Sequence, residues 1–292
     1  MEAGVPIQLV LPLVIALMML GVGMALRVTD FAALLHTPRP AAVGLLGMLG
    51  VLPGLAFLLA WAFALPPALS VGLVLLAASP SASTSTLFTF LARGDAALSL
   101  TLTAASKLLP VFMIPLYVGL ASRLFADADT ALSLTFADTS ERLLQMVLLP
   151  TLIGMTLRHY RPAFSNAARP YVTRTAVIAL VVLILMLVYR ERHALPDMLL
   201  AAGPAALSLC VLGMACANGL CALLGLRAAQ RTAITLEVGM QSGGTAIAIA
   251  AGVLAAPAMA VPAAVYALIM YAVAGGFVAW RRRASVQVLP AG

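Results

Sequence analysis

The chain has 292 residues, of which 63% are hydrophobic and only 9% charged, and its mean hydropathy is +1.08. A soluble domain carries about 25% charged residues, so this composition excludes a sizeable soluble domain. It predicts an all-α polytopic membrane protein that forms one transmembrane domain over residues 1–292.

The apolar segments predict nine transmembrane helices, because a bilayer core of about 30 Å requires about 20 apolar residues per helix. They cover residues 7–26, 41–65, 68–92, 96–120, 143–157, 175–189, 198–224, 232–255 and 260–280, the fifth and sixth extending into their flanks. Prolines at Pro66-Pro67 and Ala256-Pro257 predict tight turns between successive spans.

The arginines are distributed unevenly between the two sides that nine spans define. Twelve lie on one side: Arg27, Arg39, Arg93, Arg158, Arg161, Arg169, Arg174, Arg227, Arg231, Arg281, Arg282 and Arg283. Four lie on the other: Arg123, Arg142, Arg190 and Arg192. The positive-inside rule places the twelve in the cytoplasm, so we expect the N-terminus outside and the C-terminus inside a plasma membrane, namely a bacterial inner membrane. This asymmetry accounts for the net charge of +7 without nucleic-acid binding.

Two charged residues fall inside predicted spans, Lys107 in the fourth and Glu237 in the eighth. A charge at bilayer depth costs at least about 3 kcal/mol, so it usually persists because it is paired or used. We therefore predict a buried functional site in which Lys107 and Glu237 are partners.

The third span contains a hydroxyl-rich run with a proline, SPSASTST, at residues 79–86. Pro80 removes a backbone donor, so a break in the helix is expected there. Irregular backbone at membrane depth persists only where it is buried in protein or lines a water-filled cavity. The hydroxyls can satisfy the freed backbone groups and bind a ligand; the alternative is a packing seam between helices.

The fourth span places Ser99, Thr103 and Lys107 on one helical stripe, at positions i, i+4 and i+8. A stripe of Ser and Thr alone is more typical of helix packing, and the added lysine favours a ligand stripe. Lys107 can act as a built-in cation or proton switch. The alternative is a lysine whose stem packs and whose head bonds freed carbonyls.

The eighth span contains the run EVGMQSGGT at residues 237–245. Glycine permits backbone angles that turn carbonyls toward a ligand, although a close-packed glycine face with an inert Glu237 is the alternative. The third and eighth spans run in opposite directions, and two such broken helices predict an inverted-repeat transporter with a mid-membrane site. Half-helix N-termini suit an anionic substrate, and freed carbonyls and hydroxyls suit Na⁺.

Other classes of protein are less well supported. The spans contain no H-E-x-x-H pair, no histidine and no paired aspartates, so an intramembrane enzyme is disfavoured and no cofactor is expected. Tight Gly and Ser packing at one crossing favours an occluded site over a channel. A non-transporting sensor would be expected to carry a soluble signalling module, and the composition predicts no such module. Cys210, Cys216 and Cys221 are predicted to be buried packing residues.

Three motifs resemble those of the bile acid:sodium symporter family. Residues 23–31 contain GMALR and DF, residues 91–99 read LARGDAALS, and residues 237–241 read EVGMQ. The resemblance implies two inverted five-helix repeats, here without the first helix. It also implies a panel domain of helices 7–26, 143–157 and 175–189, and a core domain over 41–120 and 198–280. The implied activity is secondary transport of small organic anions by alternating access, coupled to Na⁺.

The resemblance also implies ligand sets. A first cation site would use the side chains of Ser85, Thr86, Ser99, Thr103 and Glu237. A second would use Glu237, the backbone of Val238 and Met240, and Gln241. Substrate contacts would come from Ser83, Thr84, Ser242, Gly243 and Tyr271.

Several positions depart from the family pattern. Thr86 replaces an Asn, and Met48 replaces a Gln. The thioether of Met48 is a poor Na⁺ ligand, so an oxygen ligand is lost at that position. Ser242 and Tyr271 replace amide residues, which argues against a bile acid as the substrate. These departures leave an alternative open, in which Lys107 replaces the bound cation and transport is proton-coupled or independent of Na⁺.

Overall fold

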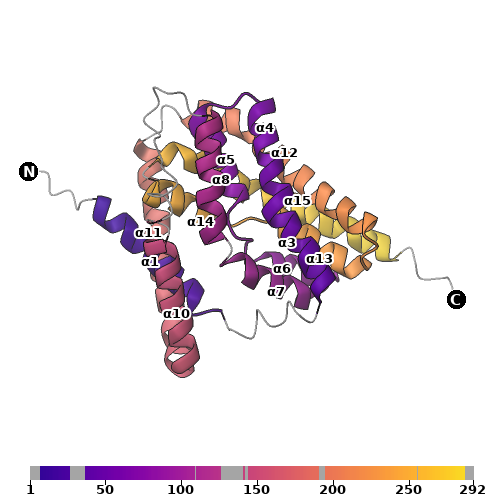
Figure 1. Cartoon of the computed structure of the whole chain (residues 1–292), viewed down its shortest axis with the longest axis horizontal. Helices are drawn as coiled ribbons and strands as arrows, with labels where there is room; N and C mark the ends of the chain where they lie inside the picture. The colour runs from indigo at the N-terminus through magenta and orange to yellow at the C-terminus, as the bar shows by residue number, and fades with distance from the viewer. Residues whose placement is uncertain are drawn as a thin grey trace, which may run out of the picture.

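The computed structural model describes residues 7–26, 37–108, 110–125, 141, 144–190, 195–254 and 256–286. Within these ranges the regular structure is helical, apart from one isolated β-bridge between Ser81 and Gln241. Figure 1 shows the arrangement of these helices.

The helices of the first half begin with α1 and end with α8. Their bounds are α1 (Ile7–Gly23), α3 (Pro38–Leu46), the π-helical turn η2 (Gly47–Val51), α4 (Leu52–Ala62), α5 (Pro67–Ala77), α6 (Ser85–Leu91), α7 (Ala96–Ser106) and α8 (Pro110–Phe125). Proline begins α3, α5 and α8, where its missing N–H costs nothing.

The second half contains two 29-residue helices and several short ones. The bounds are η3 (Leu144–Leu148), α10 (Leu149–Tyr160), α11 (Pro162–Arg190), α12 (Leu195–Leu223), α13 (Ala228–Gly239), α14 (Gly243–Ala248), η4 (Ile249–Val253), η5 (Pro257–Ala260) and α15 (Val261–Val286). α3, η2 and α4 follow one another directly, as do α14 and η4.

Helix covers part of each of the nine predicted spans. Among the described residues, three stretches are long and apolar enough to cross a membrane on length and composition alone: Pro38–Ala62, Pro196–Leu223 and Pro257–Arg283. Several others are shorter because the chain breaks inside the span, as at Ala77 and Gly239. The count of nine crossings and the inverted repeats remain predictions.

The predicted breaks occur, and a further one was not expected. The third span is interrupted between α5 and α6, and the eighth between α13 and α14. We expected the fourth span to be continuous, which is wrong, because α7 ends at Ser106 and α8 begins at Pro110. Pro110 cannot supply the N–H that would continue α7, so it starts a new helix.

The helices form two groups (Figure 1). α1, α10 and α11 pack against one another, while α12 packs on α13 and α15, and α5 packs on α4 and α8. Glycines allow close approach in the first group: a Cβ on Gly23 would lie 2.1 Å from the carbonyl oxygen of Thr151, and one on Gly154 2.4 Å from that of Leu20. Whether the two groups are domains that move separately remains a prediction.

The prediction of three buried cysteines is partly wrong. Cys210 and Cys221 are buried, but Cys216 is exposed. Eleven residues are close to three full turns of an α-helix, so Cys210 and Cys221 share the face of α12 that packs on its neighbours, and Cys216 lies off that face.

Several arginines predicted on one side of the membrane bond to helix ends. The Arg39 side chain donates to the carbonyl of Leu224, and Arg282 donates to that of Leu91. Arg281 donates to the carbonyl of Ala228 at the start of α13. Which side of a membrane this end faces remains a prediction.

Candidate functional site

The two interrupted spans meet at their breaks. The amide of Ala82 donates to the carbonyl of Met240 at 2.7 Å, and the amide of Ser242 donates to that of Pro80 at 2.8 Å. These bonds flank the bridge between Ser81 and Gln241. Backbone groups that lack helical partners are thus paired across the crossing, which is how irregular backbone is stabilised away from water.

Side chains that we did not single out complete this pairing. The hydroxyl of Tyr266, on α15, donates to the carbonyl of Gly239 at the end of α13, over 2.9 Å. Ser106, at the end of α7, lies 3.0 Å from the hydroxyl of Ser81 and accepts from the amide of Ser81 at 3.2 Å. A lone tyrosine or serine in an apolar segment gives no sequence signal of such a role.

Glu237 lies at the centre of a hydroxyl cluster and is fully buried. The hydroxyls of Ser85 and Ser99 each donate to Glu237 Oε1 at 2.5 Å. Thr103 Oγ1 lies 2.9 Å from Oε1 and 3.0 Å from Oε2. Donors of this kind stabilise a carboxylate that has been removed from water.

Thr86 closes this cluster on its less buried side. Its hydroxyl lies 3.1 Å from that of Ser99 and 3.4 Å from that of Thr103. The structure therefore brings together all five side chains that the resemblance implied for a first cation site. They come from α6, α7 and α13, so the cluster depends on packing between these three helices.

The residues implied for a second cation site lie beside the first. The Gln241 amide nitrogen donates to the carbonyl of Val238 at 2.9 Å, and the carbonyl of Met240 accepts from Ala82. Each carbonyl keeps a second lone pair. Gln241 Oε1 is buried and has no hydrogen-bond partner among the residues that the structure describes, so it is an acceptor that suits a cation.

Met48, which stands where the family has a glutamine, lies in the π-helical turn η2 and is buried. A Cβ on its neighbour Gly47 would lie 2.9 Å from a methyl carbon of Val238, which places η2 against α13. π-helical turns inside α-helices occur frequently at functional sites. The thioether supplies packing here but no oxygen ligand.

The predicted substrate contacts are less compact than the hydroxyl cluster around Glu237. Ser83 is exposed within the first break, and Thr84 is the N-cap of α6. Ser242 caps α14 by accepting from the amide of Thr245 at 3.4 Å. A Cβ on Gly243 would lie 2.9 Å from a backbone oxygen of α15, so glycine is required for close packing. Tyr271, 44% exposed, lies on α15 with its ring centroid 6.0 Å from that of Phe88.

Lys107 is the C-cap residue of α7 and is half-buried. Thr103, which contacts Glu237, lies one turn earlier on the same helix. A cation at a helix C-terminus is favoured by the partial negative charge of the last carbonyls. The position suits either of the two roles that the sequence left open, and pairing with Glu237 remains a prediction.

The oxygen atoms of the cluster are suitable ligands for Na⁺. Hard cations take oxygen ligands, and the cluster offers four hydroxyls, one carboxylate and the unpaired Gln241 Oε1. Among the described residues no group of three His, Cys, Asp or Glu could hold a metal ion. Hydroxyls that now donate to Glu237 can rotate so that their lone pairs face a cation.

Apolar helices, two of them interrupted at one point around a buried oxygen cluster, define a multi-pass membrane transporter. The chain belongs to the sodium bile acid symporter family, whose sequence model matches residues 12–196. That match extends from the first predicted span into the start of α12.

Similar proteins come from plants and bacteria. The chain is 31% identical over 275 residues to the probable sodium/metabolite cotransporter BASS1 of Arabidopsis thaliana chloroplasts, covering 92% of this chain and 66% of that protein. It is 30% identical over 265 residues to the uncharacterized sodium-dependent transporter YocS of Bacillus subtilis, covering 87% of this chain and 77% of YocS. The chain thus spans just under two thirds of the Arabidopsis protein.

Replacing Ser85 with alanine should weaken sodium binding without unfolding the protein. The change removes one of the four hydroxyl oxygens that a bound cation would contact, and a polar contact to a charged group contributes about 1.5–3 kcal/mol, so we expect an apparent Na⁺ affinity roughly tenfold lower. Sodium-dependent thermal stabilisation in detergent measures it. Ser70→Ala is the matched control, because Ser70 is equally buried and bonds the carbonyl of Leu65 outside the cluster. Equal effects of the two changes would contradict the assignment.

Proposed function

We propose that the chain is a sodium symporter for small organic anions that works by alternating access. The observation that carries the proposal is the oxygen cluster around Glu237, to which Ser85, Ser99 and Thr103 donate. The printed names of the relatives describe sodium-dependent transport and support Na⁺ as the coupling ion.

The geometry supports a direct physical coupling between cation and substrate. Glu237 and Gln241 flank the end of α13, and the following residue, Ser242, begins the second half of the span. Its amide is bonded to Pro80 and its hydroxyl caps α14. A cation that draws in Glu237 and Gln241 would therefore order the same backbone that presents Ser83 and Ser242 to a substrate.

In this proposal the anion binds at the crossing from the exposed side. Ser83 supplies an exposed hydroxyl, and half-buried Thr84 and Ser242 supply neighbouring ones. Hydroxyl donors can hold a carboxylate without a fixed positive charge, so binding would depend on the cation bound nearby. Movement of α1, α10 and α11 relative to the other helices would then expose the crossing to either side.

Uptake into proteoliposomes tests this function. Purified protein would be reconstituted and supplied with labelled organic acids, with Na⁺ and proton gradients imposed separately. We expect one or more organic anions to accumulate only with an inward Na⁺ gradient. Uptake of none of the acids, or uptake of neutral solutes alone, would contradict the proposal.

The role of Lys107 separates sodium symport from its alternative. Because the printed names of the relatives describe sodium-dependent transport, we expect wild-type uptake to be stimulated by Na⁺ and Lys107→Ala to retain that stimulation. Lys107→Arg is the control that keeps the charge at the end of α7. If Lys107→Ala instead gains Na⁺ dependence, or loses a pH dependence that the wild type shows, the ammonium replaces the bound cation and the carrier is proton-coupled or sodium-independent.

A further inference from the structure

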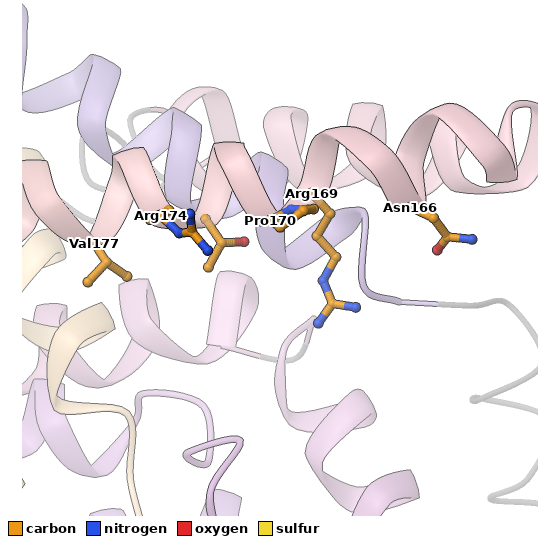
Figure 2. A pocket seen from close by; sticks show the side chains of 6 residues that line it. Asn166, Arg169, Pro170, Arg174 and Val177 are labelled. Carbon is orange, nitrogen blue, oxygen red and sulfur yellow. The ribbon is translucent and has the colours of Figure 1, made fainter.

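A cavity of about 460 Å³ opens on the surface of α11, away from the crossing. Its lining consists of two arginines and four other residues on the same stretch of helix: Asn166, Arg169, Pro170, Thr173, Arg174 and Val177. Figure 2 shows Asn166, Arg169 and Val177 projecting from the same side of α11.

The spacing of these residues forms a single helical face. Asn166, Arg169 and Thr173 follow one another at intervals of three and four residues, which brings side chains together on a helix. α11 is anchored against α1 at this level, because a Cβ on Gly21 would lie 3.1 Å from Thr173 Oγ1. The face is therefore held by packing of its own helix group.

The polar groups of this face are donors. Arg169 and Arg174 are exposed guanidinium groups, which present planar sets of N–H donors. Asn166 Oδ1 accepts a hydrogen bond from half-buried Arg158 of α10. The amide N–H groups of Asn166 therefore point away from Arg158 and can donate to a ligand. None of the described residues that line the cavity is a carboxylate.

We propose that this face of α11 is a second anion-binding site, which takes the phosphate or carboxylate group of a ligand. Arginine forks match both groups with paired hydrogen bonds, and the Asn166 amide and Thr173 hydroxyl add neutral donors. The group belongs either to a soluble anion or to the headgroup of an anionic phospholipid, since both present the same chemistry. The predicted topology places the site on the cytoplasmic side, where such lipids and metabolites occur.

The site is independent of the sodium symport proposed above. It uses a different helix group from Glu237 and would bind its ligand in the absence of Na⁺.

Calorimetric titration of the full-length protein in neutral detergent tests the inference, with inorganic phosphate and succinate as soluble probes in choline buffer. We expect at least one probe to bind, and Arg169→Gln and Arg174→Gln each to weaken binding about tenfold. Binding should also weaken as salt is added. Glu237→Gln should leave the affinity unchanged, so failure at the crossing is distinguished from failure here.

A second arm uses native mass spectrometry after reconstitution in a mixture of phosphatidylglycerol and phosphatidylcholine. Retention of phosphatidylglycerol that is lost in Arg169→Gln, without binding of phosphate or succinate, identifies the lipid headgroup as the ligand. Arg283→Gln is the matched control, because Arg283 is an exposed arginine at the end of α15. No binding in either arm, or an equal loss in Arg283→Gln, would overturn the proposal.

Discussion

Replacing Glu237 with glutamine should abolish sodium-driven uptake while the protein still folds. Glutamine has nearly the same size and keeps an oxygen for the donors Ser85, Ser99 and Thr103. It removes the charge that balances a cation in a region with little water. An uncompensated buried charge costs about 3–5 kcal/mol, so we expect the sodium affinity to fall by roughly a hundredfold or more.

Proteoliposome uptake as a function of Na⁺ concentration measures this effect, with thermal melting in detergent to verify folding. Glu141→Gln is the matched control, because Glu141 is exposed and bonds Gln145 rather than the cluster. Wild-type Na⁺ stimulation in a folded Glu237→Gln protein would show that the carboxylate is structural. The cluster would then not be the sodium site.

Gly72→Ala should destabilise the fold substantially, although alanine favours a helix. A Cβ at position 72 of α5 would lie 2.3 Å from the carbonyl oxygen of Met259 in η5, and 2.9 Å from the Met259 Cα and carbonyl carbon. Met259 is fully buried, so backbone rather than a flexible side chain must move. Overpacking of this kind costs about 1–3 kcal/mol, which for a protein of this size lowers the Tm by several degrees.

Gly54→Ala, on the neighbouring helix α4, should not lower the Tm. Among the described residues, no atom outside the adjoining backbone of α4 lies within 4 Å of a Cβ at that position. Alanine is a better helix former than glycine by about 1 kcal/mol, so the Tm should stay the same or rise. If Gly72→Ala melts like Gly54→Ala, the contact between α5 and η5 is looser than the structure shows. α5 leads directly into the first break, so loosening should also reduce uptake.

The breaks in the third and eighth spans could be predicted because they depend on local chemistry. Pro80 cannot continue a helix, and Gly239 and Gly243 tolerate close or unusual backbone. The hydroxyl run and the lone carboxylate are also costly at membrane depth unless they are used. These features depend on short stretches of residues, and the structure has both breaks at the expected places.

The break after Ser106 also has a local signal, because Pro110 cannot continue a helix, although the fourth span was predicted as one helix. Other features could not be read from local sequence. The contact of Ser81 with Ser106 joins residues from two different spans. Tyr266 reaches Gly239 only because α15 packs beside the end of α13.

The sequence by itself determined the class of protein, the positions of most helices and the members of the hydroxyl cluster around Glu237, since apolar length, proline and the resemblance in motifs are properties of the chain alone. The tertiary structure decided which groups are adjacent: that Ser85, Ser99 and Thr103 converge on Glu237, and that the two breaks share hydrogen bonds. Buried polar groups must find partners away from water. Which partners they find depends on how distant helices pack.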